Sequence, residues 1–215
     1  MAPPVAEILR RLEERFPHAR CELEHSNPLE LLVATILSAQ CTDERVNRVT
    51  RSLFRKYRTA EDYANAPQGE LEEDIRPTGY FQQKARYLRQ AARILVERYG
   101  GQVPADFEAL LELPGVARKT ANVIMGTAFG IPTGIVVDTH VRRVAYRLGL
   151  TQAQDPNRIE QDLMALIPQE DWIRASHLFI FLGRYLCLAR SPRCEECPLA
   201  DLCPRQGVES PSARR

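Results

Sequence analysis

The chain has 215 residues, and 44% of them are apolar. This composition suffices for a sizeable hydrophobic core, in one large domain or two small ones. The formal net charge is +1, so total charge gives no argument for nucleic-acid binding, which must rest on local clusters. The most apolar stretch, residues 29–39, is shorter than the roughly 20 residues that cross a bilayer. We expect no membrane contact and, because the N-terminus does not resemble a signal peptide, a cytoplasmic protein.

Apolar residues recur with a helical period along most of the chain. Residues 27–30 predict an N-cap asparagine, a first-turn proline and a capping-box glutamate for a helix that ends near residue 39. Thr42 is the expected cap of the next helix. A further apolar stripe over residues 85–99 stops at a pair of glycines, which is typical of a helix end.

Later segments continue the helical pattern. Further helices are predicted over residues 106–112, 117–129, 139–148, 156–167 and 171–186. Only residues 135–137 resemble a strand, and because their neighbours offer no pairing partner we expect an extended linker and an all-α fold. Two glycines and a proline in residues 130–134 indicate a division of the chain there.

Four of the six cysteines lie within seventeen residues near the C-terminus, at Cys187, Cys194, Cys197 and Cys203. Thiolates this close together can surround one soft metal centre. The C-x6-C-x2-C-x5-C order lacks the two separated Cys-x-x-Cys pairs of a zinc ribbon, and it favours a [4Fe–4S] cluster over zinc. Two disulfides are the least favoured alternative, because disulfide frameworks belong to small oxidised domains.

Residues 113–121 join two predicted helices through a tight turn. Such a turn can present backbone N–H groups at a helix N-terminus to a phosphate. The alternative is a purely structural corner, in which Gly115 only permits positive φ.

Two charged residues follow this turn. Lys119 lies in the first helical turn, where the helix dipole and Arg118 disfavour its cation and favour a neutral, nucleophilic amine. From this residue alone, an exposed phosphate-binding lysine is the favoured interpretation. Asp138 follows the apolar run at a helix start, where most aspartates are N-caps. It is also placed to bring a carboxylate into a cleft, where it could take a proton or stabilise a cation.

Together, LPGVARKTANV, VDTHVRRV and the four-cysteine spacing resemble the endonuclease III family of helix-hairpin-helix DNA glycosylases, over about residues 5–205. The resemblance implies two helical lobes with a DNA cleft between them. One is a six-helix lobe with the hairpin, residues 21–132. The other combines residues 1–20 and 133–205 and carries a [4Fe–4S] cluster, and residues 206–215 form a disordered tail.

The resemblance also implies residue roles. Lys119 is the expected nucleophile and Asp138 the essential carboxylate, with the four cysteines as cluster ligands. The expected DNA contacts are Gln40, Tyr80, Gly115, Ala117, Thr120, His140, Arg190 and Arg193. Two positions depart from the family pattern, since Ala117 stands where glycine is usual and Tyr80 where a smaller aliphatic residue is expected.

The implied function is base-excision repair. The enzyme would remove oxidised pyrimidines from duplex DNA and nick the strand by β-elimination through a Schiff base on Lys119. Its partner would be double-stranded DNA with damaged bases or abasic sites, bound by a monomer. If the source is a bacterium, this monomer would be associated with the nucleoid. The alternatives are a monofunctional adenine or mismatch glycosylase, which needs no amine at position 119, and a non-catalytic module that binds damaged DNA.

Overall fold

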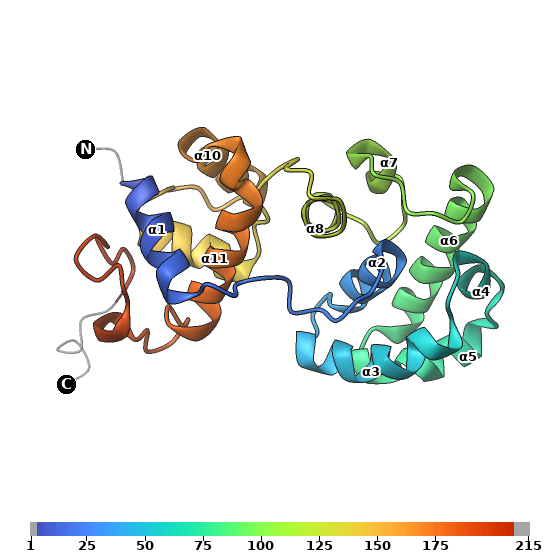
Figure 1. The fold of residues 1–215 in the computed structure, drawn as a ribbon. Helices are drawn as coiled ribbons and strands as arrows, with labels where there is room; N and C mark the ends of the chain where they lie inside the picture. Colours follow the sequence, from blue (N-terminus) through green and yellow to red (C-terminus); the bar gives the residue numbers. More distant parts are fainter. Residues whose placement is uncertain (1–3, 209–215) are drawn as a thin grey trace. The chain divides into compact units, whose positions relative to one another are not determined.

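The computed structural model describes residues 4–208, and all its regular elements within them are helices (Figure 1). The prediction of an all-α fold is confirmed. Within residues 4–208, no helix is both long enough and apolar enough for a membrane span. Contacts divide the chain into two compact units, Cys21–Thr133 and Met1–Arg20 with Gly134–Arg215. We call the first the hairpin unit and the second the cysteine unit.

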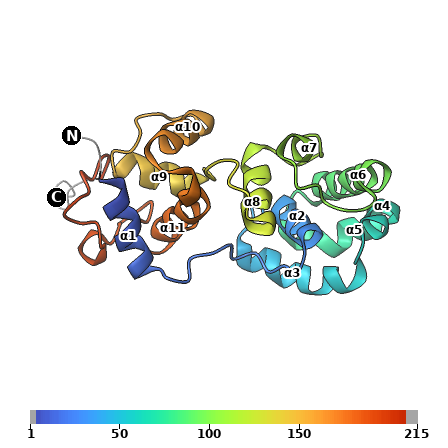
Figure 2. The same ribbon diagram turned by 45° about the horizontal axis from the view of Figure 1, so that its top comes forward.

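The hairpin unit contains seven α-helices, one more than the expected six, because three short helices separate the longer ones. They are α2 (Pro28–Leu37), α3 (Asp43–Lys56), α4 (Ala60–Asn65), α5 (Gln68–Ile75), α6 (Phe81–Tyr99), α7 (Phe107–Leu111) and α8 (Arg118–Phe129), with a 3-10 turn η1 (Arg76–Thr78) before α6. The core surrounds α2, which is buried from Leu31 to Leu37. Helix α6 packs against α2, α4 and α5, and α8 lies alongside α2 (Figure 2).

The predicted caps set the helix starts in this unit. The Asn27 side chain accepts a hydrogen bond of 2.9 Å from the Glu30 amide. The Glu30 carboxylate reaches back to the amide of Ser26, at 2.6 Å, rather than to that of the capping asparagine. The Thr42 side chain caps α3, and α6 ends at Gly100 with φ +58°.

The cysteine unit brings the N-terminal helix beside the C-terminal third of the chain (Figure 1). Its elements are α1 (Val5–Arg15), α9 (Thr139–Arg147), α10 (Pro156–Leu166), a 3-10 turn η2 (Gln169–Asp171), α11 (Trp172–Tyr185) and a 3-10 turn η3 (Cys194–Glu196). Helix α11 packs against both α1 and α9. The core of the unit is separate from that of the hairpin unit.

Residues 135–137 form the expected extended linker into α9, and all three are buried. The Val136 amide donates a hydrogen bond of 3.0 Å to the Ser176 hydroxyl of α11. At the other end of α9, the Gln206 amide donates to the Arg147 carbonyl. The expected disordered tail, residues 206–215, therefore starts with residues that contact α9, and from residue 209 on it lies outside the described residues.

Candidate functional site

The turn between α7 and α8 is held in the core of the hairpin unit by Leu113 and Val116, which are both buried. Gly115 has φ +85°, a value that favours glycine. A Cβ atom at this position would also lie 3.0 Å from the Tyr87 ring of α6. Both the backbone conformation and the close contact with α6 therefore require glycine at residue 115.

The first turn of α8 is not capped by a side chain. Its N-cap residue is Ala117, which is exposed and has no side chain able to accept a hydrogen bond. The Arg118 guanidinium lies 5.2 Å from the centre of the Phe107 ring, which fixes it against α7. Lys119 is exposed, whereas the side chain of Thr120 is buried. A DNA contact at Thr120 would therefore have to use its backbone.

The first turn of α9 is capped by Asp138. Its Oδ1 atom accepts hydrogen bonds of 2.8 Å from the amides of His140 and Val141. The N-cap interpretation of this residue is thus correct. Because both bonds end on Oδ1, the cap does not use the second carboxylate oxygen, and the residue is only half-buried. The carboxylate can cap the helix and still take part in chemistry.

His140 and Arg143 connect this helix start to the cysteines. Arg143 lies with its Nη2 atom 3.2 Å from His140 Nδ1 and donates from the same nitrogen to the Gly183 carbonyl at 2.7 Å. Its Nε donates to the Cys187 carbonyl at 2.9 Å. A Cβ atom on Gly183 would lie 2.7 Å from His140 Cβ, so glycine at this position is what allows α11 to approach α9. Of His140, Arg143 and Gly183, only His140 was among the expected site residues.

The four clustered cysteines line one cavity of the cysteine unit, together with Arg147 and Leu186. None of the six cysteines forms a disulfide, which excludes the disulfide alternative. Burial raises the pKa of the Cys197 and Cys203 thiols, and the neighbouring cysteines add to this effect. Bound iron reverses the balance, since a coordinating thiol is deprotonated.

The arrangement of the cysteines around this cavity favours a cluster over a single ion. In residues 4–208, no group of three or more His, Cys, Asp or Glu side chains is arranged to hold one metal ion. A four-iron cluster is larger than one ion and needs its four thiolates around a wider space. The four sulfurs around the cavity suit this requirement.

Arg147, at the end of α9, holds the two ends of the cysteine loop together. The guanidinium is buried and donates to the Leu188 carbonyl at 2.7 Å, to the Ala189 carbonyl at 3.1 Å and to Cys187 Sγ at 3.3 Å. The backbone carbonyl oxygen of Arg147 lies 3.3 Å from Cys203 Sγ. One residue of α9 thus contacts the first and last cysteines of the loop.

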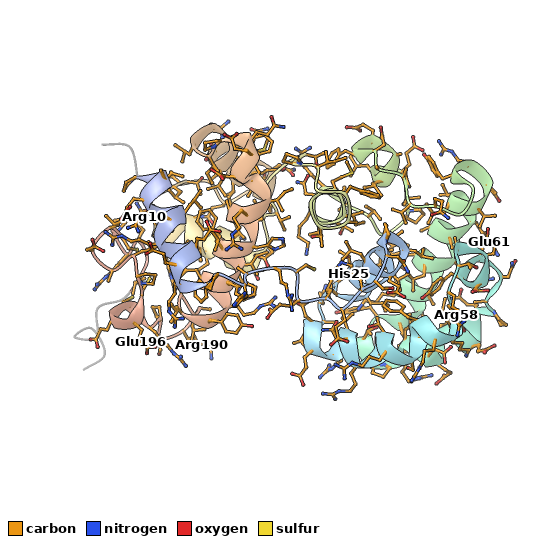
Figure 3. The ribbon with its side chains drawn as sticks, viewed as in Figure 1. Arg10, His25, Arg58, Glu61, Arg190 and Glu196 are labelled. Carbon is orange, nitrogen blue, oxygen red and sulfur yellow. The ribbon has the colours of Figure 1, made fainter. Side chains whose placement is uncertain are left out.

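The remaining expected DNA contacts lie on loops. Gln40 is exposed in the loop between α2 and α3, and Tyr80 is 67% exposed directly before α6. Arg190 and Arg193 are exposed in the loop between the first two clustered cysteines. Figure 3 shows Arg190, with Glu196 of η3, pointing outward from the cysteine unit.

The structure thus groups the expected site residues into sets. The cysteines share one cavity, and Lys119 shares the hairpin unit with Gln40, Tyr80 and the hairpin turn. Lys119 belongs to the hairpin unit and Asp138 to the cysteine unit.

Two buried cations of these regions were not identified from the sequence. Arg147 is 8% exposed and Lys84 is 3% exposed. The detectable signal for Lys84 is its position, since it falls in phase with the buried face of α6 formed by Leu88, Ala91 and Leu95. A charged residue on an apolar helix face needs an explanation.

Comparison with known proteins identifies the class first. Residues 33–169 match the model of the HhH-GPD superfamily of base excision DNA repair proteins. Residues 187–203 match the iron-sulfur binding domain of endonuclease III. The protein therefore carries a [4Fe–4S] cluster, and the four cysteines that line the cavity span the matched range.

The chain is also similar to individual known proteins over most of its length. The chain is 56% identical to an endonuclease III of Synechocystis sp., over 92% of this chain and 90% of the relative. A solved non-covalent endonuclease III–DNA complex is 50% identical, with a TM-score of 0.89 and 94% of each chain covered. A structure of a trapped endonuclease III–DNA covalent intermediate is 49% identical, with the same TM-score of 0.89 and the same coverage of 94%.

The chain belongs to the endonuclease III family. It is accordingly a DNA glycosylase with AP lyase activity, and it acts in base-excision repair, as the sequence motifs predicted.

Proposed function

We propose that the amine of Lys119 is the nucleophile of this enzyme and that Asp138 is the carboxylate that assists it. The main support is that the chain has only three lysines and that the side chains of the other two are engaged elsewhere. Lys84 is buried and donates two hydrogen bonds to backbone carbonyls. Lys56 forms ion pairs of 2.6 Å with both Glu70 and Asp74.

Ion pairing matters here because a nucleophilic amine must be neutral. The carboxylates beside Lys56 raise the pKa of its amine and hold it in the charged form. Lys119 is exposed, forms no ion pair with any residue of the described part of the chain, and lies in the first turn of α8. Lys119 is therefore the lysine best suited to attack a sugar.

The proposed reaction begins with Nζ of Lys119 bonding to C1′ of the damaged nucleotide while the C1′–N bond to the base breaks. The base leaves with a proton, and loss of the amine proton and ring opening give a Schiff base between the lysine and C1′. The imine acidifies the C2′ proton, and its removal expels the 3′ phosphate by β-elimination. Water then hydrolyses the imine and restores the amine. Asp138 would stabilise the cationic sugar or accept a proton.

The proposed substrate is duplex DNA that contains oxidised pyrimidines or abasic sites, and the enzyme would act as a monomer. The target nucleotide must leave the stack before the amine can reach C1′, at a cost of a few kcal/mol. Gln40 and Tyr80 would occupy the vacated space. The uncapped start of α8, with Gly115 and Ala117, would bind backbone phosphate, and so would the backbone of Thr120.

On the cysteine unit, His140, Arg190 and Arg193 are the further proposed DNA contacts. The [4Fe–4S] cluster, held by the four cysteines, would supply the cross-link that keeps Arg190 and Arg193 in one loop. Because the relatives are bacterial enzymes that act on DNA, we also infer a cytoplasmic location at the nucleoid.

Borohydride reduction of the imine on abasic duplex DNA tests this proposal. The wild-type protein should form a covalent adduct, and Lys119→Ala should form none. Lys56→Met is the matched control, since it removes another lysine of the same unit, and it should keep the wild-type yield. An undiminished adduct in Lys119→Ala would exclude this residue as the nucleophile.

A further inference from the structure

Lys84 occupies a position that is unfavourable for a cation. It lies in the first turn of α6 and is only 3% exposed. Burial removes water from the ammonium group, and the helix N-terminus repels positive charge. Burial also lowers the pKa of the Lys84 amine. A residue that destabilises the fold in two ways is expected to have a compensating role.

The hydrogen bonds of Lys84 connect two loops. Its Nζ donates to the Leu37 carbonyl at 2.8 Å and to the Thr78 carbonyl at 2.9 Å. Leu37 is the last residue of α2, where helix carbonyls lack intrahelical partners and the helix dipole is negative. Thr78 is the last residue of η1. The amine thus fixes the end of α2 relative to the end of η1.

Each loop has a residue with a strained backbone within three positions of the carbonyl that Lys84 contacts. Gln40 has φ +53° and follows Leu37 by three positions, and Tyr80 has φ +48° and follows Thr78 by two. Only four residues other than glycine have positive φ in the described part of the chain, and these are two of them. Such conformations cost free energy and persist only where the surroundings enforce them.

The strained conformations hold exposed side chains. Gln40 is exposed, and Tyr80 is 67% exposed although it is large and aromatic. Neither backbone is explained by burial of its own side chain. Lys84 is the buried group that both loops share, through one nitrogen atom.

We propose that Lys84 is a positioning residue that sets the spacing between the Gln40 and Tyr80 loops and thereby controls how the enzyme opens the duplex. This inference rests on the proposed function, in which Gln40 and Tyr80 fill the space left by the target nucleotide. Lys84 does not contact DNA or the reacting atoms, because it is buried and acts through two backbone carbonyls.

The test replaces Lys84 by methionine, which has a similar length but no donor. Lys56→Met is the matched control in the same unit. Hydrogen exchange in the free protein reports on the loops, through the Cys41 amide bonded to Ser38 and the Gly79 amide bonded to Arg76. Exchange at both amides should be faster in Lys84→Met by about tenfold, with exchange in α8 unchanged.

Two measurements with DNA separate opening from chemistry. The fluorescence of 2-aminopurine beside a lesion in duplex DNA reports unstacking, and its change on binding should be largely lost in Lys84→Met. Excision from that duplex should fall by about 10-fold to 100-fold, the cost of a small misplacement. Borohydride trapping on single-stranded abasic DNA, which needs no opening, should stay within about twofold of the wild-type value.

Several outcomes would overturn the proposal. These are wild-type exchange at either loop, wild-type opening of the duplex, or an equal loss of trapping on single-stranded DNA. If Lys84→Met does not fold, Lys84→Arg takes its place. In that variant, hydrogen exchange in the loops and opening of the duplex should change together. A change in one without the other would contradict the proposal that loop spacing controls duplex opening. Failure of the proposed nucleophile appears separately, as an adduct that persists in Lys119→Ala.

Discussion

The two helices that carry the proposed catalytic groups begin in opposite ways. Helix α9 starts with Asp138, whose carboxylate accepts two backbone amides. Helix α8 starts with Ala117, which has no capping side chain. A carboxylate at a helix start stabilises the helix and excludes anions, whereas an uncapped start is less stable but can accept a phosphate. In the proposed function, the start of α8 lacks the stability of a capping side chain but leaves its backbone amides for a DNA phosphate.

The largest expected effect is at the start of α9. Asparagine is as good an N-cap as aspartate, so Asp138→Asn should keep stability but remove the negative charge. Single-turnover excision should fall by about 10²-fold to 10⁴-fold, the usual range for a lost acid–base group. Asp138→Ala should show the same loss and also lower the free energy of unfolding by about 1 kcal/mol. Wild-type excision in Asp138→Asn would limit this residue to its capping role.

The converse change gives α8 the kind of start that α9 has. Ala117→Asp should stabilise the protein by about 1 kcal/mol, because the new carboxylate can cap the helix. The same carboxylate would repel a DNA phosphate, so duplex affinity should fall by about tenfold or more. Thermal denaturation and DNA titration measure the two effects. Equal or higher affinity would exclude phosphate binding at this helix start.

A substitution at Gly183 should shift the start of α9 without altering Asp138. Gly183→Ala places a methyl group against His140 Cβ, at 2.7 Å before any relaxation. Overpacking should lower the free energy of unfolding by about 1–3 kcal/mol and reduce excision. Gly69→Ala is the control, since no atom lies within 4 Å of a Cβ there. That exposed helical change should stabilise by about 0.5–1 kcal/mol.

The smallest expected effect restores the usual family residue at the α8 start. Ala117→Gly should improve the N-cap by about 0.5–1 kcal/mol and allow closer approach of the backbone to phosphate. A small gain in duplex affinity, with excision per bound complex unchanged, is the expected result of titration and single-turnover assays. A loss of affinity would mean that the methyl group of Ala117 contributes to the contact.

Features that depend on neighbouring residues could be predicted from the sequence. The caps at Asn27 and Thr42, the helix end at Gly100 and the four-cysteine spacing all follow from interactions over a few positions. The short helices α4 and α5, of six and eight residues, were not predicted. Segments of that length show too little of the helical period.

Features that depend on distant partners could not be predicted. Lys84 bonds to the Leu37 carbonyl, 47 positions away, and Arg147 to that of Leu188, 41 positions away. Every residue has a backbone carbonyl, so the sequence does not show which carbonyl accepts a hydrogen bond. The only indication in the sequence is a cation in phase with an apolar helix face. The capping-box glutamate gives a milder example, because the sequence does not distinguish the amide of Asn27 from that of Ser26.

The chain has only three lysines, so the site of covalent attachment can be read directly. The central claim is that Lys119 forms the Schiff base. Borohydride-trapped adduct on abasic duplex DNA should be digested, and the modified peptide identified by mass spectrometry. The account predicts attachment at Lys119 alone. Attachment at Lys56, at Lys84 or at the terminal amine would contradict it.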